Sequence, residues 1–150
     1  MIQLLRTDSG NTDFIELVRQ LDIELAQRDG DEHPFYAQFN KIDKIKHVIV
    51  AYEDGQFAGC GAIKEYAPGI MEIKRMFTRP QNRGRGIASK VLRELEAWAG
   101  ELNYNKCILE TGKRQEEAIG LYKKSGYVII PNYGQYAGIE NSVCFEKELP

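Results

Sequence analysis

The sequence predicts an α/β protein of the mixed (α+β) kind, with one mixed sheet and helices on both of its faces. Three strand-like segments follow one another over residues 47–78, and helical and strand-like segments alternate from residue 87 onward. A meander followed by such an alternation is typical of a single sheet covered on both sides. The 150 residues, 43% of them hydrophobic and 28% charged, fit one globular domain over residues 1–150.

The N-terminal part is predicted to hold one strand and one long helix. The strand is expected over residues 2–7, and Asn11-Thr12-Asp13 then supplies a helix cap. Residues 27–43 are polar and contain glycine and proline, so we expect a loop with a short second helix around Tyr36, which can cover a substrate as a lid. The apolar positions of the first helix recur at helical spacing, at Phe14, Leu17, Val18, Leu21 and Leu25.

The middle of the chain reads as three strands joined by two tight turns. Residues 47–53 are strongly strand-like, and Asp54-Gly55 is a hairpin turn signal before the partner strand at residues 56–66. Residues 67–69 (Ala-Pro-Gly) turn the chain again, and the next strand is expected over residues 70–78.

The C-terminal half is predicted to add two helices and three strands, which brings the sheet to about seven strands. The first helix begins at Ile87 and carries an apolar face through Leu102, and Asn103 and Asn105 end it. The second helix of this half ends before Gly126, which serves as a glycine C-cap. The remaining elements are a strand at 106–110, a helix at 115–124, a strand at 127–130, a loop at 131–141 and a strand at 142–149.

Composition narrows the classes of function. The formal net charge of −2 disfavours non-specific nucleic-acid binding. The N-terminus is too short and soon too polar for a signal peptide, and no apolar run is long enough to span a bilayer, so a cytoplasmic protein without a membrane partner is the expectation.

The cysteines and histidines do not form a recognisable chemical site. Cys60, Cys107 and Cys144 each fall in a predicted strand, and we expect three buried, reduced thiols; a cysteine nucleophile at position 60 or 144 is the alternative. No Cys-x-x-Cys pair occurs, and His33 and His47 have no metal-ligand companion at helical spacing, so no metal is expected.

A glycine- and arginine-rich turn at residues 81–86 predicts a binding site for a phosphate-bearing ligand. The turn lies between the strand at 70–78 and the helix that begins at Ile87, so backbone N–H groups and the positive end of the helix dipole converge there. Gly84 and Gly86 permit close approach. A P-loop would need Gly-Lys-Ser/Thr, which is missing. A dinucleotide fingerprint needs a third small residue and usually lies in an early βα unit, whereas this turn lies mid-chain after a meander. Coenzyme A is the third candidate ligand.

Two motifs together resemble the GNAT superfamily of acyl-CoA-dependent N-acetyltransferases. Gln81-x-x-Gly84-x-Gly86 after a central strand is similar to the family's pyrophosphate motif. The segment at 110–127, with Glu-Thr-Gly before a helix that carries Leu-Tyr-Lys-Lys-x-Gly-Tyr, resembles its second cofactor-contacting region. The resemblance covers about residues 48–149 and implies a mostly antiparallel GNAT-like sheet, acetyl-CoA as co-substrate and, since family members often pair, a homodimer as one expected assembly.

The resemblance also implies how acetyl-CoA binds. Backbone groups of Met76 and Thr78 would pair with the pantetheine arm, and an N–H near Met76 or Phe77 would hold the oxyanion. For the arginines of the turn, the alternative is a solvated surface cluster. The full set of implied cofactor-binding residues is Met76, Phe77, Thr78, Gln81, Arg83, Gly84, Arg85, Gly86, Ile87, Ala88, Gln115 and Tyr122.

Two residues are implied to be catalytic. Glu72 matches the glutamate that part of the family uses as general base, and the alternative is a strand carboxylate paired with Lys74 or Arg75. Tyr122 matches the general-acid tyrosine, and the alternative is a core aromatic residue of an amphipathic helix. Direct attack of an amine in a ternary complex needs no enzyme nucleophile.

The identity of the acceptor stays open at this level. A primary amine of a small molecule or peptide is expected. Tyr133 and Tyr136 either wall its pocket or pack in the core. A non-catalytic acyl-CoA-binding regulatory module and a nucleic-acid binder are the alternative functions. Acidic residues that either attract a cationic amine or form a solvated surface are Asp22, Glu24, Asp29, Asp31 and Glu32.

Overall fold

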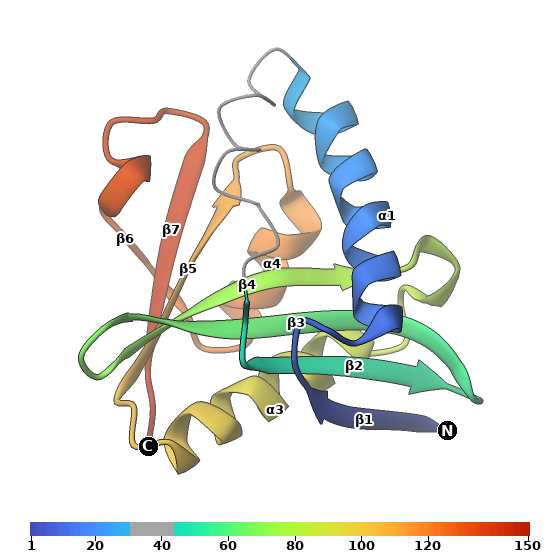
Figure 1. Ribbon diagram of the computed structural model, residues 1–150. Helices are drawn as coiled ribbons and strands as arrows, with labels where there is room; N and C mark the ends of the chain where they lie inside the picture. The colour runs from blue at the N-terminus through green and yellow to red at the C-terminus, as the bar shows by residue number, and fades with distance from the viewer. Residues whose placement is uncertain (31–43) are drawn as a thin grey trace.

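The computed structural model describes residues 1–30 and 44–150, which form a seven-stranded sheet in the order β1-β2-β3-β4-β5-β7-β6 (Figure 1). Every neighbouring pair is antiparallel except β4 and β5, which run parallel. The mixed, mostly antiparallel sheet that the sequence predicted is confirmed. The strands are β1 (Ile2–Thr7), β2 (His47–Glu53), β3 (Gln56–Ala67), β4 (Ile70–Thr78), β5 (Lys106–Gly112), β6 (Val128–Ile130) and β7 (Ser142–Glu148).

Helices cover both faces of the sheet, as predicted (Figure 1). Helix α1 (Thr12–Asp29) packs on one face, and α3 (Ile87–Glu101) and α4 (Glu116–Lys124) pack on the other. Each face therefore has its own apolar core. Phe14, Leu17 and Val18 of α1 are fully buried in one core, and Leu92 and Leu95 of α3 are fully buried in the other. No helix within the described ranges is long and apolar enough to cross a membrane.

Local sequence signals fix several element ends. The side chain of Asn11 accepts a hydrogen bond from the backbone N–H of Phe14, which caps α1 as expected. Asp54 and Gly55 both adopt positive φ in the β2–β3 turn. Two short 3-10 helices lie inside predicted turns and loops, η2 (Pro80–Asn82) and η3 (Gly134–Tyr136). The helix and lid predicted around Tyr36 lie outside the described residues.

Strands β4 and β5 separate along their length. They pair only from Ile70 with Lys106 to Glu72 with Ile108, although β4 continues to Thr78 and β5 to Gly112. A bulge in β4 accompanies the separation, because Cys60 pairs with Phe77 and Ala62 pairs with Lys74, which leaves two residues of β4 opposite one of β3. One of them, Arg75, has a φ of 61°, and its carbonyl accepts a hydrogen bond from the buried thiol of Cys60 at 3.3 Å. The bulge opens the sheet at its centre.

Gly61 of β3 lies opposite this bulge, and we expect Gly61→Ala to destabilise the fold. A Cβ there would stand 2.6 Å from the sulfur of Met76, 2.8 Å from Leu95 and 2.9 Å from Val91. Overpacking of this kind lowers the free energy of unfolding by about 2 kcal/mol, which urea denaturation measures. The matched control is Gly120→Ala, at an open position of α4, which should raise the free energy of unfolding by about 0.5–1 kcal/mol. Equal stability of the two variants would contradict the tight contact.

Candidate active site

A continuous cleft begins where β4 and β5 separate. Its outer part runs past the N-terminus of α3 and encloses a volume of about 400 Å³, and its inner part lies between β4, β5 and α1. The two parts are continuous, because some residues line both of them, namely Leu21, Met76, Gln115, Ala118 and Tyr122. A ligand that follows β4 can therefore reach from the glycine turn to the centre of the sheet.

The outer part of the cleft is shaped by the glycine turn. Gly84 and Gly86 have φ values of 81° and 79°, and both line the cleft with Ile87 and Ala88. Gly86 is the N-cap of α3 and offers no capping side chain, so the first N–H groups of the helix face the cleft without an intrahelical partner. This arrangement favours an anion through amide donors and the helix dipole.

The two arginines of the turn have different surroundings. Arg83 lines the outer cleft, where its guanidinium donates to the carbonyl of Thr78 at 2.9 Å and to Glu24 of α1 at 2.9 Å. Arg85 instead pairs with Glu53 at 2.8 Å and is not among the lining residues, and Gln81 does not line the cleft either. Two further cations line the outer part, Arg28 and Lys124, and neither was predicted from the sequence.

Tyr122 of α4 lies at the junction of the two parts. Its side chain is 5% exposed, and it packs tilted against Phe145 and edge-on against Tyr127. Burial, and then the charge of Glu110, raise the pKa of the Tyr122 phenol above its ordinary value, so the group remains protonated near neutral pH. A protonated phenol in this place can donate a hydrogen bond or a proton to a ligand in the cleft.

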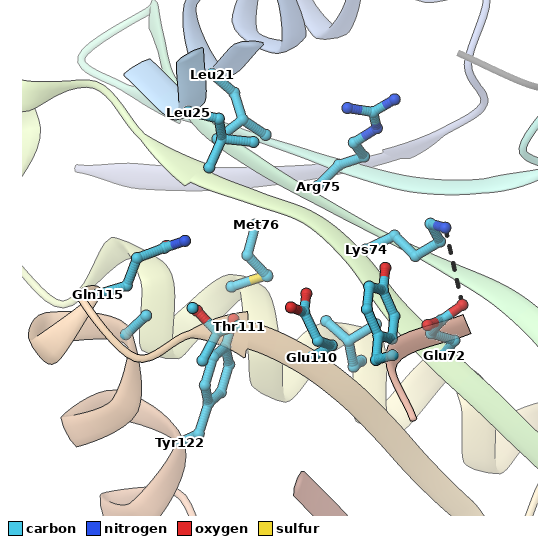
Figure 2. Close-up of a pocket in the computed structure, with 14 residues that line it drawn as sticks. Leu21, Leu25, Glu72, Lys74, Arg75, Met76, Glu110, Thr111, Gln115 and Tyr122 are labelled. Atoms are coloured by element: carbon cyan, nitrogen blue, oxygen red, sulfur yellow. Dashed lines mark ion pairs between the residues drawn. The ribbon is translucent and has the colours of Figure 1, made fainter. Parts of the chain in front are cut away.

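Glu72 lines the inner part and is held from two sides. The Tyr133 hydroxyl donates to its Oε2 at 2.6 Å. On the other side, Lys74 Nζ lies 3.8 Å from its Oε1, as the dashed line in Figure 2 shows. Tyr133 is positioned by edge-to-face contacts with Tyr66 and Tyr136, whose ring centroids lie 5.1 Å and 5.8 Å from its own. The pairing of Glu72 with Lys74 that the sequence left as an alternative is thus present, in a carboxylate that also faces the cleft.

Glu110 of β5 also lines the inner part, together with Thr111 and Tyr136. Glu110 begins the second motif of the sequence, from which no catalytic role was predicted for it. A signal was available, since Glu110 immediately precedes the Thr-Gly turn into α4 and therefore falls at the end of a buried strand. The register of β5 against β4 could not be obtained from the sequence alone.

Helix α1 is tied to the rim of the cleft by ion pairs. Asp22 pairs with the guanidinium of Arg75 at 3.2 Å, and Glu24 pairs with both Arg83 and Arg28. The side chain of Arg75 is 2% exposed, whereas that of Asp22 is 45% exposed, so the ion pair joins a buried guanidinium to a carboxylate that reaches water. These carboxylates are thus engaged by arginines of the protein. Asp31, Glu32 and the side chain of Asp29 are outside what the structure describes.

The thiols do not contribute to the cleft. Cys60, Cys107 and Cys144 are all buried and unpaired with one another, which confirms the expected reduced core cysteines. Burial raises the pKa of both Cys60 and Cys107 to about 12, so neither is a thiolate near neutral pH. Among residues 1–30 and 44–150, no group of three or more metal-ligating side chains occurs.

Comparisons with known proteins agree with this geometry. A sequence profile described as the Acetyltransferase (GNAT) family matches residues 14–127. The chain is 32% identical to IAA acetyltransferase of Azospirillum brasilense, over 90% of each chain. A Klebsiella pneumoniae structure assigned as an acyl-CoA N-acyltransferase superposes with a TM-score of 0.83 at 30% identity, over 100% and 99% of the two chains. PaiA N-acetyltransferase of Thermoplasma acidophilum, solved with coenzyme A, shares the fold with a TM-score of 0.73 at 15% identity, over 99% of each chain.

Proposed function

This chain belongs to the acetyltransferase (GNAT) family, and on that premise we propose that it moves an acetyl group from acetyl-CoA to a primary amine of a small molecule or peptide. The protein is an acyl-CoA-dependent N-acetyltransferase in class, and the proposal concerns its acceptor and its mechanism. The observation that carries it is the cleft itself. One channel joins an amide-lined glycine turn to a buried tyrosine and, beyond it, to a carboxylate.

In this proposal, acetyl-CoA lies along the separated edge of β4. The backbone of Met76 and Thr78 pairs with the pantetheine arm as an added strand would, because β5 has moved away from this edge. The N–H groups of residues 83–88 hold the pyrophosphate, with Arg83 beside them. Gln115 and Tyr122 line the thioester end, where both parts of the cleft meet.

The chemistry requires a neutral amine, although a free alkylammonium has a pKa of about 10.4. A carboxylate in the inner cleft takes the proton, and Glu72 is the residue that the family resemblance assigns to this step. The amine nitrogen then attacks the thioester carbon, and a backbone N–H near Met76 or Phe77 stabilises the oxyanion. The carbon–sulfur bond breaks, and Tyr122 supplies a proton to the leaving sulfur.

A thiol-release assay with acetyl-CoA and a panel of amines tests this function. Suitable acceptors are n-butylamine, 1,4-diaminobutane, tyramine and a lysine-containing peptide, with longer acyl-CoA donors in parallel. Turnover that needs both acetyl-CoA and an amine would support the proposal. Tight binding of acetyl-CoA without turnover of any acceptor would favour the non-catalytic regulatory module instead.

The cofactor placement makes Arg83 more important than Arg85. We expect Arg83→Ala to raise the Kd of acetyl-CoA about tenfold, because a charge-assisted hydrogen bond to phosphate contributes about 1.5 kcal/mol. Arg85→Ala, whose side chain pairs with Glu53, serves as the matched control and should change the Kd less than twofold. Isothermal titration of both variants compares them. A larger loss at Arg85 than at Arg83 would contradict this placement.

A further inference from the structure

Glu110 and Glu72 lie on the same face of the sheet, one on each of the two strands that separate. Glu72 pairs with Ile108 in the last parallel rung, and Glu110 is two residues further along β5, so its side chain points to the same face. Both side chains line the inner cleft (Figure 2). The opening between the strands is therefore flanked by two carboxylates, of which the family resemblance assigned a role to one.

The two carboxylates differ in their distance from the thioester end. In Figure 2 the carboxylate of Glu110 stands between Tyr122 and Glu72. The pKa values of the neighbouring phenols agree with this order. The charge of Glu110 raises the pKa of Tyr122, where Glu72 is not among the causes, whereas at Tyr136 the charges of Glu110 and Glu72 both raise the pKa after burial. Glu110 is the carboxylate nearer to the proposed reacting carbon.

The contacts of Glu72 favour a different task for it. Its Oε2 accepts the short bond from Tyr133, and its Oε1 faces Lys74. Both oxygens are thus engaged by groups that fix the orientation of the carboxylate. A fixed carboxylate at the far end of the cleft suits the binding and orientation of the acceptor.

We propose, resting on the proposed function above, that Glu110 is the residue that takes the proton from the attacking amine, while Glu72 orients the acceptor. The ammonium of the acceptor gives one proton to the Glu110 carboxylate, which releases it to water. The nitrogen lone pair then forms the carbon–nitrogen bond. The second nitrogen proton passes to Glu110 as the carbon–sulfur bond breaks, and Tyr122 protonates the sulfur. Glu110 finally returns its proton to the Tyr122 phenolate, so the cycle closes with one proton released.

The test compares Glu110→Gln with the wild-type enzyme in the thiol-release assay, with whichever of n-butylamine, 1,4-diaminobutane or tyramine the wild-type enzyme uses best. We expect kcat/KM for the amine to fall about 100-fold at pH 7. The ratio of the wild-type kcat/KM to that of the variant should approach 1 by pH 9. The variant depends on amine that has lost its proton in solution, and the deprotonated fraction of the amine rises about tenfold per pH unit. The described titratable groups facing Glu110 are Glu72, Lys74 and Arg75 from β4, Tyr122 from α4, Tyr136 and Cys144.

Controls separate this role from a structural one. The Kd of acetyl-CoA in Glu110→Gln should stay within about threefold of the wild-type value, and Glu110→Asp should regain part of the lost kcat/KM. Glu148 is an exposed carboxylate of β7, so Glu148→Gln should leave kcat/KM unchanged. Glu110→Asp provides the same pH readout if the glutamine variant does not fold. A deficit that is constant from pH 7 to pH 9, or one smaller than about threefold, overturns the role of Glu110 while the function stands. Absence of turnover by the wild-type enzyme overturns the function itself.

Discussion

Replacing Gly86 with valine is expected to weaken acetyl-CoA binding about 100-fold, a loss of about 2.7 kcal/mol. Gly86 has a φ of 79°, which a β-branched residue adopts only at considerable cost, so the turn must distort. The distortion would move the N–H groups at the start of α3 that hold the pyrophosphate in our proposal, and the loss of one or two charge-assisted bonds accounts for the effect. Isothermal titration with acetyl-CoA measures the change in Kd.

Gly138→Val is the matched control for this experiment. Gly138 has a φ of 78° and open space around its Cα, as Gly86 does, but it lies in the loop before β7 and not at the glycine turn. Both variants should lose a similar amount of unfolding free energy, and the Kd should change only in Gly86→Val. An unchanged Kd in Gly86→Val would contradict the assignment of this turn to the pyrophosphate.

Tyr122→Phe is expected to lower kcat about 300-fold, within the range that a general acid contributes, and to change the Kd of acetyl-CoA less than about threefold. The substitution keeps the buried ring and its contacts with Tyr127 and Phe145, so the packing survives. It removes the hydroxyl that would protonate the leaving sulfur, so only the step that breaks the carbon–sulfur bond is affected. Steady-state kinetics and titration of the same preparation give both quantities.

The neighbouring ring provides the control. Tyr127→Phe removes a buried hydroxyl that donates to Glu96 at 2.8 Å, and Tyr127 does not line the cleft. We expect this variant to lose about 1 kcal/mol of unfolding free energy with kcat nearly unchanged. If both variants reduced kcat alike, or if Tyr122→Phe kept the normal rate, Tyr122 would not be the acid.

The sequence predicted those parts of the site that depend on local signals. The glycine turn, the start of α3 and the buried face of α1 each follow from residue type and spacing within about a dozen positions, because capping, φ preference and helical periodicity are local properties. Glu72 and Tyr122 lie far apart in the chain and entered through the resemblance to a family, which carries tertiary information that spacing does not. The cleft brings both of them to its lining.

The parts that the sequence did not predict depend on the pairing of distant elements. The role that we propose for Glu110 depends on the register of β5 against β4, and the different surroundings of Arg83 and Arg85 depend on the positions of Glu24 and Glu53. Ion-pair partners of exposed arginines are set by which elements become neighbours after folding, so no local pattern encodes them. The bulge at Arg75 could not be predicted from the sequence either, because nothing about an arginine indicates that its φ will be positive.

The bulge also changes which residue numbers of β4, odd or even, face each of the two cores. Before it, the odd-numbered Met71 and Ile73 point into the core beneath α3; after it, the odd-numbered Phe77 points into the core beneath α1, and Met76 takes the side facing α3. The strand is therefore two half-strands out of phase by one residue. Removing Arg75 would restore an unbroken alternation and leave Met76 and Phe77 on the sides that they now occupy, because the bulge adds one residue to the strand. The bulge therefore lengthens β4 by one residue between Glu72 and the edge proposed for the pantetheine arm, without changing which side chains beyond it face each core.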